Sequence, residues 1–155
     1  MSTLLTGQGW GKKYTNLAKE ISTWSKDPST QVGAVVIGEK GQLLSQGYNG
    51  FPRGINDTSD RLNNRERKYE LVVHAEMNAI YNASFNGVSL KDSTLYVYGL
   101  PICSECAKGI IQVGIKKVIA TRPKIYNSEW DKSTKAAEAL FREAEVMYLI
   151  DVEEE

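Results

Sequence analysis

Histidine and cysteine are scarce in this sequence of 155 residues, which contains one His and two Cys. A chain of this length buries about 68–70% of its unfolded surface and needs no disulfide to fold. Cys103 and Cys106 are also only three residues apart, so a disulfide between them would not connect distant parts of the fold. We therefore expect a reduced, soluble, intracellular protein, in the cytoplasm or, if viral, in the cytoplasm of the host. Any site built from nitrogen and sulfur ligands must use His74 and these two cysteines.

Long apolar runs and an excess of positive charge are also missing. No run approaches the ~20 residues of a membrane span, and the first residues do not resemble a secretory signal. The 19 Lys+Arg balance the 19 Asp+Glu. Because non-specific binding to nucleic acid depends on lysines and arginines that displace counterions, we expect neither polymeric nucleic acid nor membrane as a partner. Small phosphorylated ligands need only a few local donors and stay open.

Apolar periodicity and turn residues predict an α/β protein. Strands are expected over residues 31–37, 42–48, 94–98, 117–120 and 146–150, and helices over residues 10–24, 75–82, 103–113 and 134–144. We expect the aromatic stripe of the first helix to pack in the core and Ser133 to cap the last helix. Residues 49–70 have no apolar period and predict a long surface loop.

The order of these elements predicts the sheet. Strands that alternate with helices in the second half indicate crossovers onto parallel strands, and the first two strands form an antiparallel hairpin. The result is a five-stranded mixed sheet in one domain over residues 1–155, with a core of about 12–150 and an acidic tail over 151–155.

His74-Ala75-Glu76 and Cys103-Ser104-Glu105-Cys106 carry the chemistry of this sequence. Both motifs fall at predicted helix N-termini, whose partial positive charge favours the thiolate that a metal binds. A structural zinc usually has four protein ligands, whereas a catalytic zinc has three and keeps one position for water. Because His74, Cys103 and Cys106 are the only nitrogen and sulfur ligands that the sequence contains, it favours a catalytic zinc. A carboxylate could still serve as a fourth protein ligand and make the site structural.

Glu76 is the residue that favours an enzyme. Two thiolates cancel the charge of a zinc ion, so the centre acidifies water less than a three-histidine site does. A carboxylate beside the water can take its proton and pass it to a substrate. The alternatives are a thioredoxin-type redox pair, a structural zinc in a binding module, and an inert core histidine with two incidental cysteines.

An H-x-E motif followed by P-C-x-x-C is the signature of zinc deaminases. Residues 74–80, the segment 96–119, Ser25-Lys26-Asp27-Pro28 and Gly47-Tyr48-Asn49-Gly50 closely resemble the deoxycytidylate (dCMP) deaminase family. The resemblance runs over about residues 12–150. One departure is Ile102, which stands between Pro101 and the first cysteine. The resemblance implies a three-layer α/β/α cytidine-deaminase-like fold.

The resemblance also implies an activity and a set of site residues. The reaction is hydrolysis of dCMP to dUMP and ammonia, which supplies dUMP for thymidylate synthesis. Glu76 moves the protons, and His74, Cys103 and Cys106 hold the zinc. Some relatives carry a second, structural zinc on extra His and Cys, which this sequence lacks, so we expect one zinc per chain. Substrate-binding residues implied by the family are Ser25, Lys26, Asn49, Ala75 and Tyr126.

Regulation is implied as well. The family is typically hexameric, activated by dCTP and inhibited by dTTP, with Mg²⁺ on the effector triphosphate. The corresponding allosteric residues here are Tyr48, Gly50, Phe51, Arg53, Gly54, Arg61, Arg65, Arg67 and Lys68. The alternative for this segment is a solvated charged loop.

Several rival functions share the metal motif. Cytidine deaminases usually have Cys in place of His74, tRNA and DNA deaminases need a basic groove, and riboflavin-pathway deaminases have a different cysteine loop. Deamination of dCTP or another free cytosine nucleotide or nucleoside stays open. From another class, so does a non-catalytic, zinc-stabilised binding module.

Overall fold

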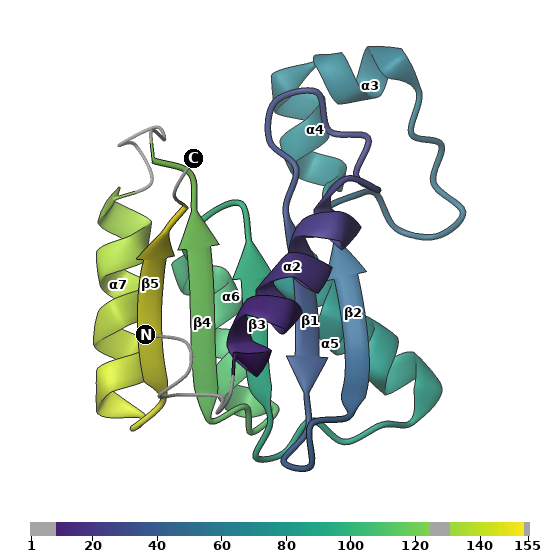
Figure 1. Cartoon of the computed structure of the whole chain (residues 1–155). Helices are drawn as coiled ribbons and strands as arrows, with labels where there is room; N and C mark the ends of the chain where they lie inside the picture. The colour runs from purple at the N-terminus through teal and green to yellow at the C-terminus, as the bar shows by residue number, and fades with distance from the viewer. Residues whose placement is uncertain (1–8, 125–130, 154–155) are drawn as a thin grey trace.

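A five-stranded mixed sheet forms the centre of the computed structural model, which describes residues 9–124 and 131–153. Its strands lie in the order β2-β1-β3-β4-β5 (Figure 1). Strand β1 pairs antiparallel with both β2 and β3, whereas the pairs β3–β4 and β4–β5 are parallel. The predicted hairpin and parallel crossovers are therefore confirmed. The strands are β1 (Gly33–Ile37), β2 (Leu43–Tyr48), β3 (Thr94–Tyr98), β4 (Lys117–Arg122) and β5 (Met147–Val152).

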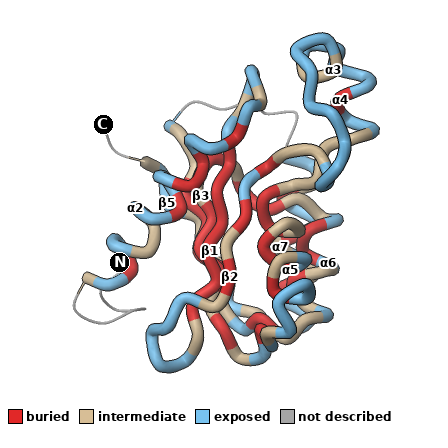
Figure 2. The backbone as a smooth tube through the Cα atoms, turned by 90° about the vertical axis from the view of Figure 1, so that its right-hand side faces the viewer, coloured by how far each residue is buried: buried red, intermediate tan, exposed pale blue. Residues whose placement is uncertain are grey.

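Helices cover both faces of this sheet, as the predicted three-layer fold requires. Helix α2 (Trp10–Ser22) lies alone on one face, and α5 (Ala75–Asn86), α6 (Ser104–Gln112) and α7 (Asp131–Glu143) cover the other (Figure 2). The larger core cluster, which includes Leu95, Val97, Ile110 and Phe141, lies on the side of the three helices. None of the described helices is both long and apolar enough to cross a membrane.

The loop expected over residues 49–70 is wrong in part, because it contains two short helices. Helix α3 (Ser59–Asn63) begins after Thr58 and α4 (Arg65–Leu71) after Asn64, and each of these side chains accepts a hydrogen bond from the backbone of the first turn. Only Lys68 is buried in the two helices. They have no apolar period because they project beyond the sheet, so periodicity could not reveal them.

The aromatic stripe of the first helix is also less buried than expected. Trp10 and Trp24 are 47% and 51% exposed, whereas the residues that α2 buries are mainly small, such as Ala18 and Ser22. At Gly33 of β1 a Cβ atom would collide with the backbone of α2 near Ala18 and Ser22, so the helix lies very close to the sheet at these small residues. Ile21 is 2% exposed and packs in the smaller core cluster, with Tyr14 against it, so this part of the stripe lies in the core as expected and the two tryptophans do not.

The start of the last helix and the end of the last strand both differ from the prediction. Ser133 lies inside α7 and does not cap it; its hydroxyl accepts a hydrogen bond from the amide of Ser104 at 2.9 Å. Strand β5 continues to Val152, and Glu153 accepts hydrogen bonds from Lys19 at 2.8 Å and Tyr98 at 2.6 Å. The start of the acidic segment is thus tied to the sheet and to α2.

We expect Gly47→Ala to destabilise the fold and displace the helix that begins at the site. A Cβ atom at Gly47 would lie 2.6 Å from the carbonyl oxygen of Ala75 and would also clash with the amide of Ala79, and this backbone of α5 cannot rotate away. Overpacking of this kind costs roughly 1–3 kcal/mol. Chemical denaturation measures the loss. Gly50→Ala is the control, since its Cβ would meet only a Tyr48 ring carbon at 3.8 Å; equal stability of the two variants would contradict the close packing.

Candidate metal centre and active site

The three predicted ligands converge at the N-termini of two helices on the same face of the sheet. His74 occupies the N-cap position of α5, and Cys103 occupies that of α6. Cys106 follows in the first turn of α6, where its amide donates a hydrogen bond to Sγ of Cys103 at 3.4 Å. Since strand β3 leads into the loop before Cys103 and residues 72–74 lead into α5, the fold brings together residues that are 29 positions apart.

The spacing of these donor atoms fits a zinc ion. Nδ1 of His74 lies 3.4 Å from Sγ of Cys103 and 3.3 Å from Sγ of Cys106. Zn–N and Zn–S bonds of about 2.0 and 2.3 Å at tetrahedral angles place two such ligand atoms roughly 3.5 Å apart. Within residues 9–124 and 131–153, this is the one group of His, Cys, Asp or Glu that could hold a metal. Three protein ligands leave a fourth position for water or substrate.

Charge is already redistributed among the three ligands. The hydrogen bond from the Cys106 thiol, together with that from His74, lowers the pKa of Cys103 to about 4. The same contact with Cys103 raises the pKa of His74 to about 9, against the opposing effect of burial. The hydrogen bond to Cys103, followed by burial, raises the pKa of Cys106. With these pKa values the thiolate of Cys103 lies beside the protonated imidazole of His74 at neutral pH. A zinc ion binds thiolates and the neutral imidazole, so its binding would release the proton of His74.

Glu76 lies in the first turn of α5 and is buried, with 5% of its surface exposed. Burial raises the pKa of Glu76 to about 7, and the nearby His74 imidazole opposes the shift. A carboxyl group with a pKa near neutrality can both accept and donate a proton at physiological pH. Its position beside the ligands therefore suits general acid–base chemistry.

These groups lie in a cavity of about 220 Å³. The ligands His74 and Cys103 and the side chain of Glu76 line it, together with apolar groups of Val32, Val72 and other residues. The remaining lining residues are Asp27, Ser29, Thr30, Asn49, Arg65, Lys68, Tyr69, Ala75, Leu100 and Pro101. The cavity thus combines a reactive centre, an apolar wall and cationic residues from α4.

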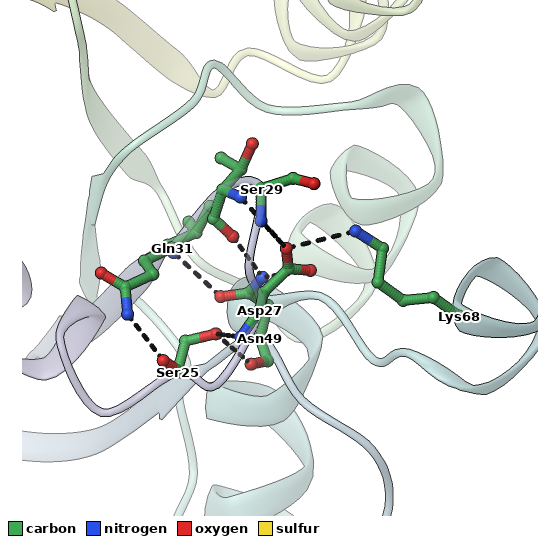
Figure 3. Close-up of polar contacts among 8 residues, drawn as sticks. Ser25, Asp27, Ser29, Gln31, Asn49 and Lys68 are labelled. Atoms are coloured by element: carbon green, nitrogen blue, oxygen red, sulfur yellow. Dashed lines mark hydrogen bonds and ion pairs between the residues drawn. The ribbon is translucent and has the colours of Figure 1, made fainter. Parts of the chain in front are cut away.

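Asp27 is the centre of a polar network in this cavity wall (Figure 3). Its Oδ1 accepts hydrogen bonds from the amides of Ser29 at 2.8 Å and Thr30 at 3.0 Å, and it pairs with Nζ of Lys68 at 3.2 Å. Asn49 donates to Oδ2 at 3.5 Å. The network fixes the loop after α2 against both the end of β2 and helix α4.

Among the expected substrate residues, Asn49 and Ala75 line the cavity and Ser25 and Lys26 do not. The hydroxyl of Ser25 donates to the carbonyl oxygen of Asn49 at 2.8 Å and so holds the loop. Lys26 pairs with Asp57 at 3.2 Å on the surface. The amide of Asn49 is engaged too, since it donates to Thr30 at 2.9 Å and accepts from Val32 at 2.9 Å. Tyr126 lies outside the described residues.

The expected allosteric residues do not gather at one place. Tyr48, Gly50 and Phe51 line a separate hollow of about 170 Å³ with Trp24 and Lys26. Arg65 and Lys68 line the cavity of Glu76 instead. The others lie on the surface: Arg53 over the ring of Phe85, Gly54 in a left-handed turn, Arg61 on the carbonyl of Asn56, and Arg67 paired with Glu70.

Several lining residues escaped the sequence analysis as site residues, and the polar or aromatic ones among them include Asp27, Thr30 and Tyr69. Asp27 precedes Pro28, and an Asp that accepts from amides two and three residues ahead is a recognisable turn. That pattern could have marked Asp27 as an anchor of the loop. Nothing in the sequence near Tyr69 indicates a cavity, because its place depends on how α4 returns to the sheet.

The fold and the site define a metal-dependent hydrolase, and the comparisons with known proteins give its family. The family model described as the cytidine and deoxycytidylate deaminase zinc-binding region matches residues 8–122. The chain belongs to this family, and it is a deaminase that acts on a C–N bond.

Named relatives agree with this placement. The chain is 40% identical to deoxycytidylate deaminase of Mus musculus over 146 residues, which cover 90% of this chain and 78% of the relative. It is 38% identical over 138 residues to an uncharacterized deaminase of Aliivibrio fischeri, with 88% and 90% of the two chains covered. Its structure is similar to that of dCMP deaminase from cyanophage S-TIM5 in complex with dCMP and dUMP, with 26% identity, a TM-score of 0.74, and 92% and 97% coverage.

Proposed function

We propose that this protein hydrolyses dCMP to dUMP and ammonia and thereby supplies dUMP for thymidylate synthesis. The observation that carries the proposal is the buried carboxyl group of Glu76 in one cavity with His74 and Cys103, which form a group of possible metal ligands together with Cys106. Relatives that are named deoxycytidylate deaminase support the choice of dCMP as substrate. The similar structure of a dCMP deaminase in complex with dCMP and dUMP supports it as well.

The chain's own residues divide the work between orientation and proton transfer. Val32, Val72 and Leu100 provide an apolar wall against which the pyrimidine ring packs. The backbone of Ala75, at the start of α5, faces the edge of the base, and Asn49 lies where the sugar is held. A zinc ion on His74 and the two cysteines would supply a water molecule acidified for attack at C4.

Glu76 is the only one of these groups suited to move protons repeatedly. We assign it two successive transfers: it takes a proton from the attacking water and gives it to N3 of the ring, and it then takes the remaining proton of the new C4 hydroxyl and gives it to the departing amine as the C4–N4 bond breaks and C4=O forms. One carboxyl group near neutral pKa serves each transfer within hydrogen-bond reach. Leu100 and Pro101 help to cover the cavity and limit the entry of further water.

Regulation forms a second part of the proposal. We place a nucleotide effector, dCTP or dTTP with Mg²⁺, at the hollow of Tyr48, Gly50 and Phe51. This hollow shares Asp27, Asn49 and Val72 with the cavity of Glu76, so a ligand there contacts the wall of the reactive site. A cytoplasmic homo-oligomer, a hexamer as in the family, completes the proposal.

A panel of dCMP, CMP, deoxycytidine and dCTP tests the substrate assignment. We expect ammonia release to be fastest with dCMP, and dUMP to form in equal amount, because cationic residues of α4 lie in the same cavity as Glu76. Each substrate is assayed with and without dCTP or dTTP as effector. Equal rates for dCMP and deoxycytidine would contradict recognition of the phosphate, and faster turnover of dCTP would reassign the substrate.

A further inference from the structure

Helix α4 contributes cationic side chains to the cavity that contains Glu76. Arg65 and Lys68 are separated by one helical turn, and both line the cavity together with Tyr69. Lys26, the cation expected to meet the substrate, does not line it and instead pairs with Asp57 at 3.2 Å. The positive charge available in this cavity beyond the metal ligands therefore comes from α4.

The charge of Lys68 is already matched by the protein. Its Nζ lies 3.2 Å from Oδ1 of Asp27, and the two side chains are only 8% and 9% exposed. A buried lysine in such a pair has little positive potential left for a ligand, because the adjacent carboxylate cancels it. Its effect is to attach α4 to the loop after α2 and so to fix where Arg65 lies.

Arg65 is in the opposite situation. In the described part of the chain no carboxylate forms an ion pair with it, and its guanidinium lies 5.3 Å from the centre of the Tyr69 ring. Arg67, two residues further along the same helix, pairs with Glu70 at 3.2 Å and does not line the cavity. An unmatched guanidinium at a cavity wall suits a phosphate group, to which it can donate two parallel hydrogen bonds.

We propose that Arg65 binds the 5′-phosphate of the substrate and so sets the preference of this chain for a nucleotide over a nucleoside. A cation–π contact with the ring of Tyr69 holds the guanidinium, and the Lys68–Asp27 pair holds the helix. The inference rests on the proposed function, since it assigns one more residue to the same cavity. It also moves Arg65 from the effector site, where the sequence had placed it, to the substrate.

Binding measured without turnover tests this role. In the Glu76→Gln background, isothermal calorimetry with the zinc-loaded protein gives the Kd of dCMP directly. We expect Arg65→Ala to raise this Kd by about tenfold or more, as for loss of a hydrogen bond between charged groups. Arg67→Ala is the matched control and should change it less than about twofold, because its ion pair is exposed.

The outcomes separate the inference from the proposed function. If Arg65→Ala leaves the Kd of dCMP within about twofold of the parent, the role of Arg65 is wrong. Equal Kd values for dCMP and deoxycytidine in the parent would overturn it as well. If the parent binds dCMP but Arg65→Ala and Arg67→Ala weaken that binding equally, the specific contact of Arg65 is wrong and the effect comes from the overall charge of α4. Failure of the native protein to release ammonia from dCMP would instead refute the proposed function.

Discussion

Replacing Glu76 with Gln is expected to lower kcat/KM for dCMP by roughly 10²–10⁴-fold, the usual contribution of general acid–base catalysis. The amide keeps the size of the side chain but can neither accept the proton of water nor return it to the base. Because Glu76 is buried in the first turn of α5 and is not one of the three ligands, the fold and the zinc content should persist. Steady-state rates together with metal analysis measure both expectations.

Glu105→Gln is the matched control for this variant. Glu105 lies between the two cysteine ligands in sequence, yet its side chain is 74% exposed and pairs with Lys108 at 2.6 Å. The same chemical change there should leave turnover close to that of the native protein. A Glu76→Gln enzyme with near-native rates and one zinc per chain would remove Glu76 from the mechanism and leave a zinc-stabilised binding module as the better interpretation.

Lys68→Met is expected to lower the free energy of unfolding by roughly 3–5 kcal/mol, the cost of leaving one member of a buried ion pair without its partner. Asp27 would keep the hydrogen bonds from the amides of Ser29 and Thr30 but would lose Lys68, its one ion-pair partner among the residues that the structure describes. The loop after α2 and helix α4 would then separate more easily. Denaturant titration measures the change.

Two further variants show whether the effect comes from the buried charge. Asp27→Asn combined with Lys68→Met removes both charges, and Asn can still accept the amide hydrogen bonds, so we expect most of the lost stability to return. Arg67→Met breaks an ion pair whose side chains are 46% and 61% exposed, and should cost less than about 1 kcal/mol. Equal losses for Lys68→Met and Arg67→Met would contradict the importance of the buried pair.

The sheet was predictable because its strands carry their own signals. The β-branched run of β1, the turn after it and the alternation of strands with helices in the second half predict the antiparallel hairpin and the parallel crossovers, whereas the order β2-β1-β3-β4-β5 and the antiparallel pairing of β1 with β3 come only from the structure. The helix ends were harder, because capping residues decide them. Helices α3 and α4 depend on the N-caps Thr58 and Asn64, which are local signals that an apolar period does not contain.

The metal ligands were also predictable, since the sequence has so few His and Cys to choose from. The cationic residues that line the cavity were not, because lysines and arginines are common and their partners depend on the tertiary structure. Lys26 and Lys68 have the same side chain, yet one pairs with Asp57 on the surface and the other with Asp27 in the cavity wall. Arg65 lines the cavity and Arg67 does not, and this difference depends on how α4 packs back against the sheet.

The most direct measurement of the central claim is the conversion of dCMP by the native, zinc-loaded protein, followed by separation of the nucleotides and assay of ammonia. We predict that dUMP and ammonia form in equal amounts, and that Glu76→Gln, prepared in parallel with the same zinc content, forms almost none. A native protein that holds zinc at His74, Cys103 and Cys106 and leaves dCMP unchanged would contradict the account.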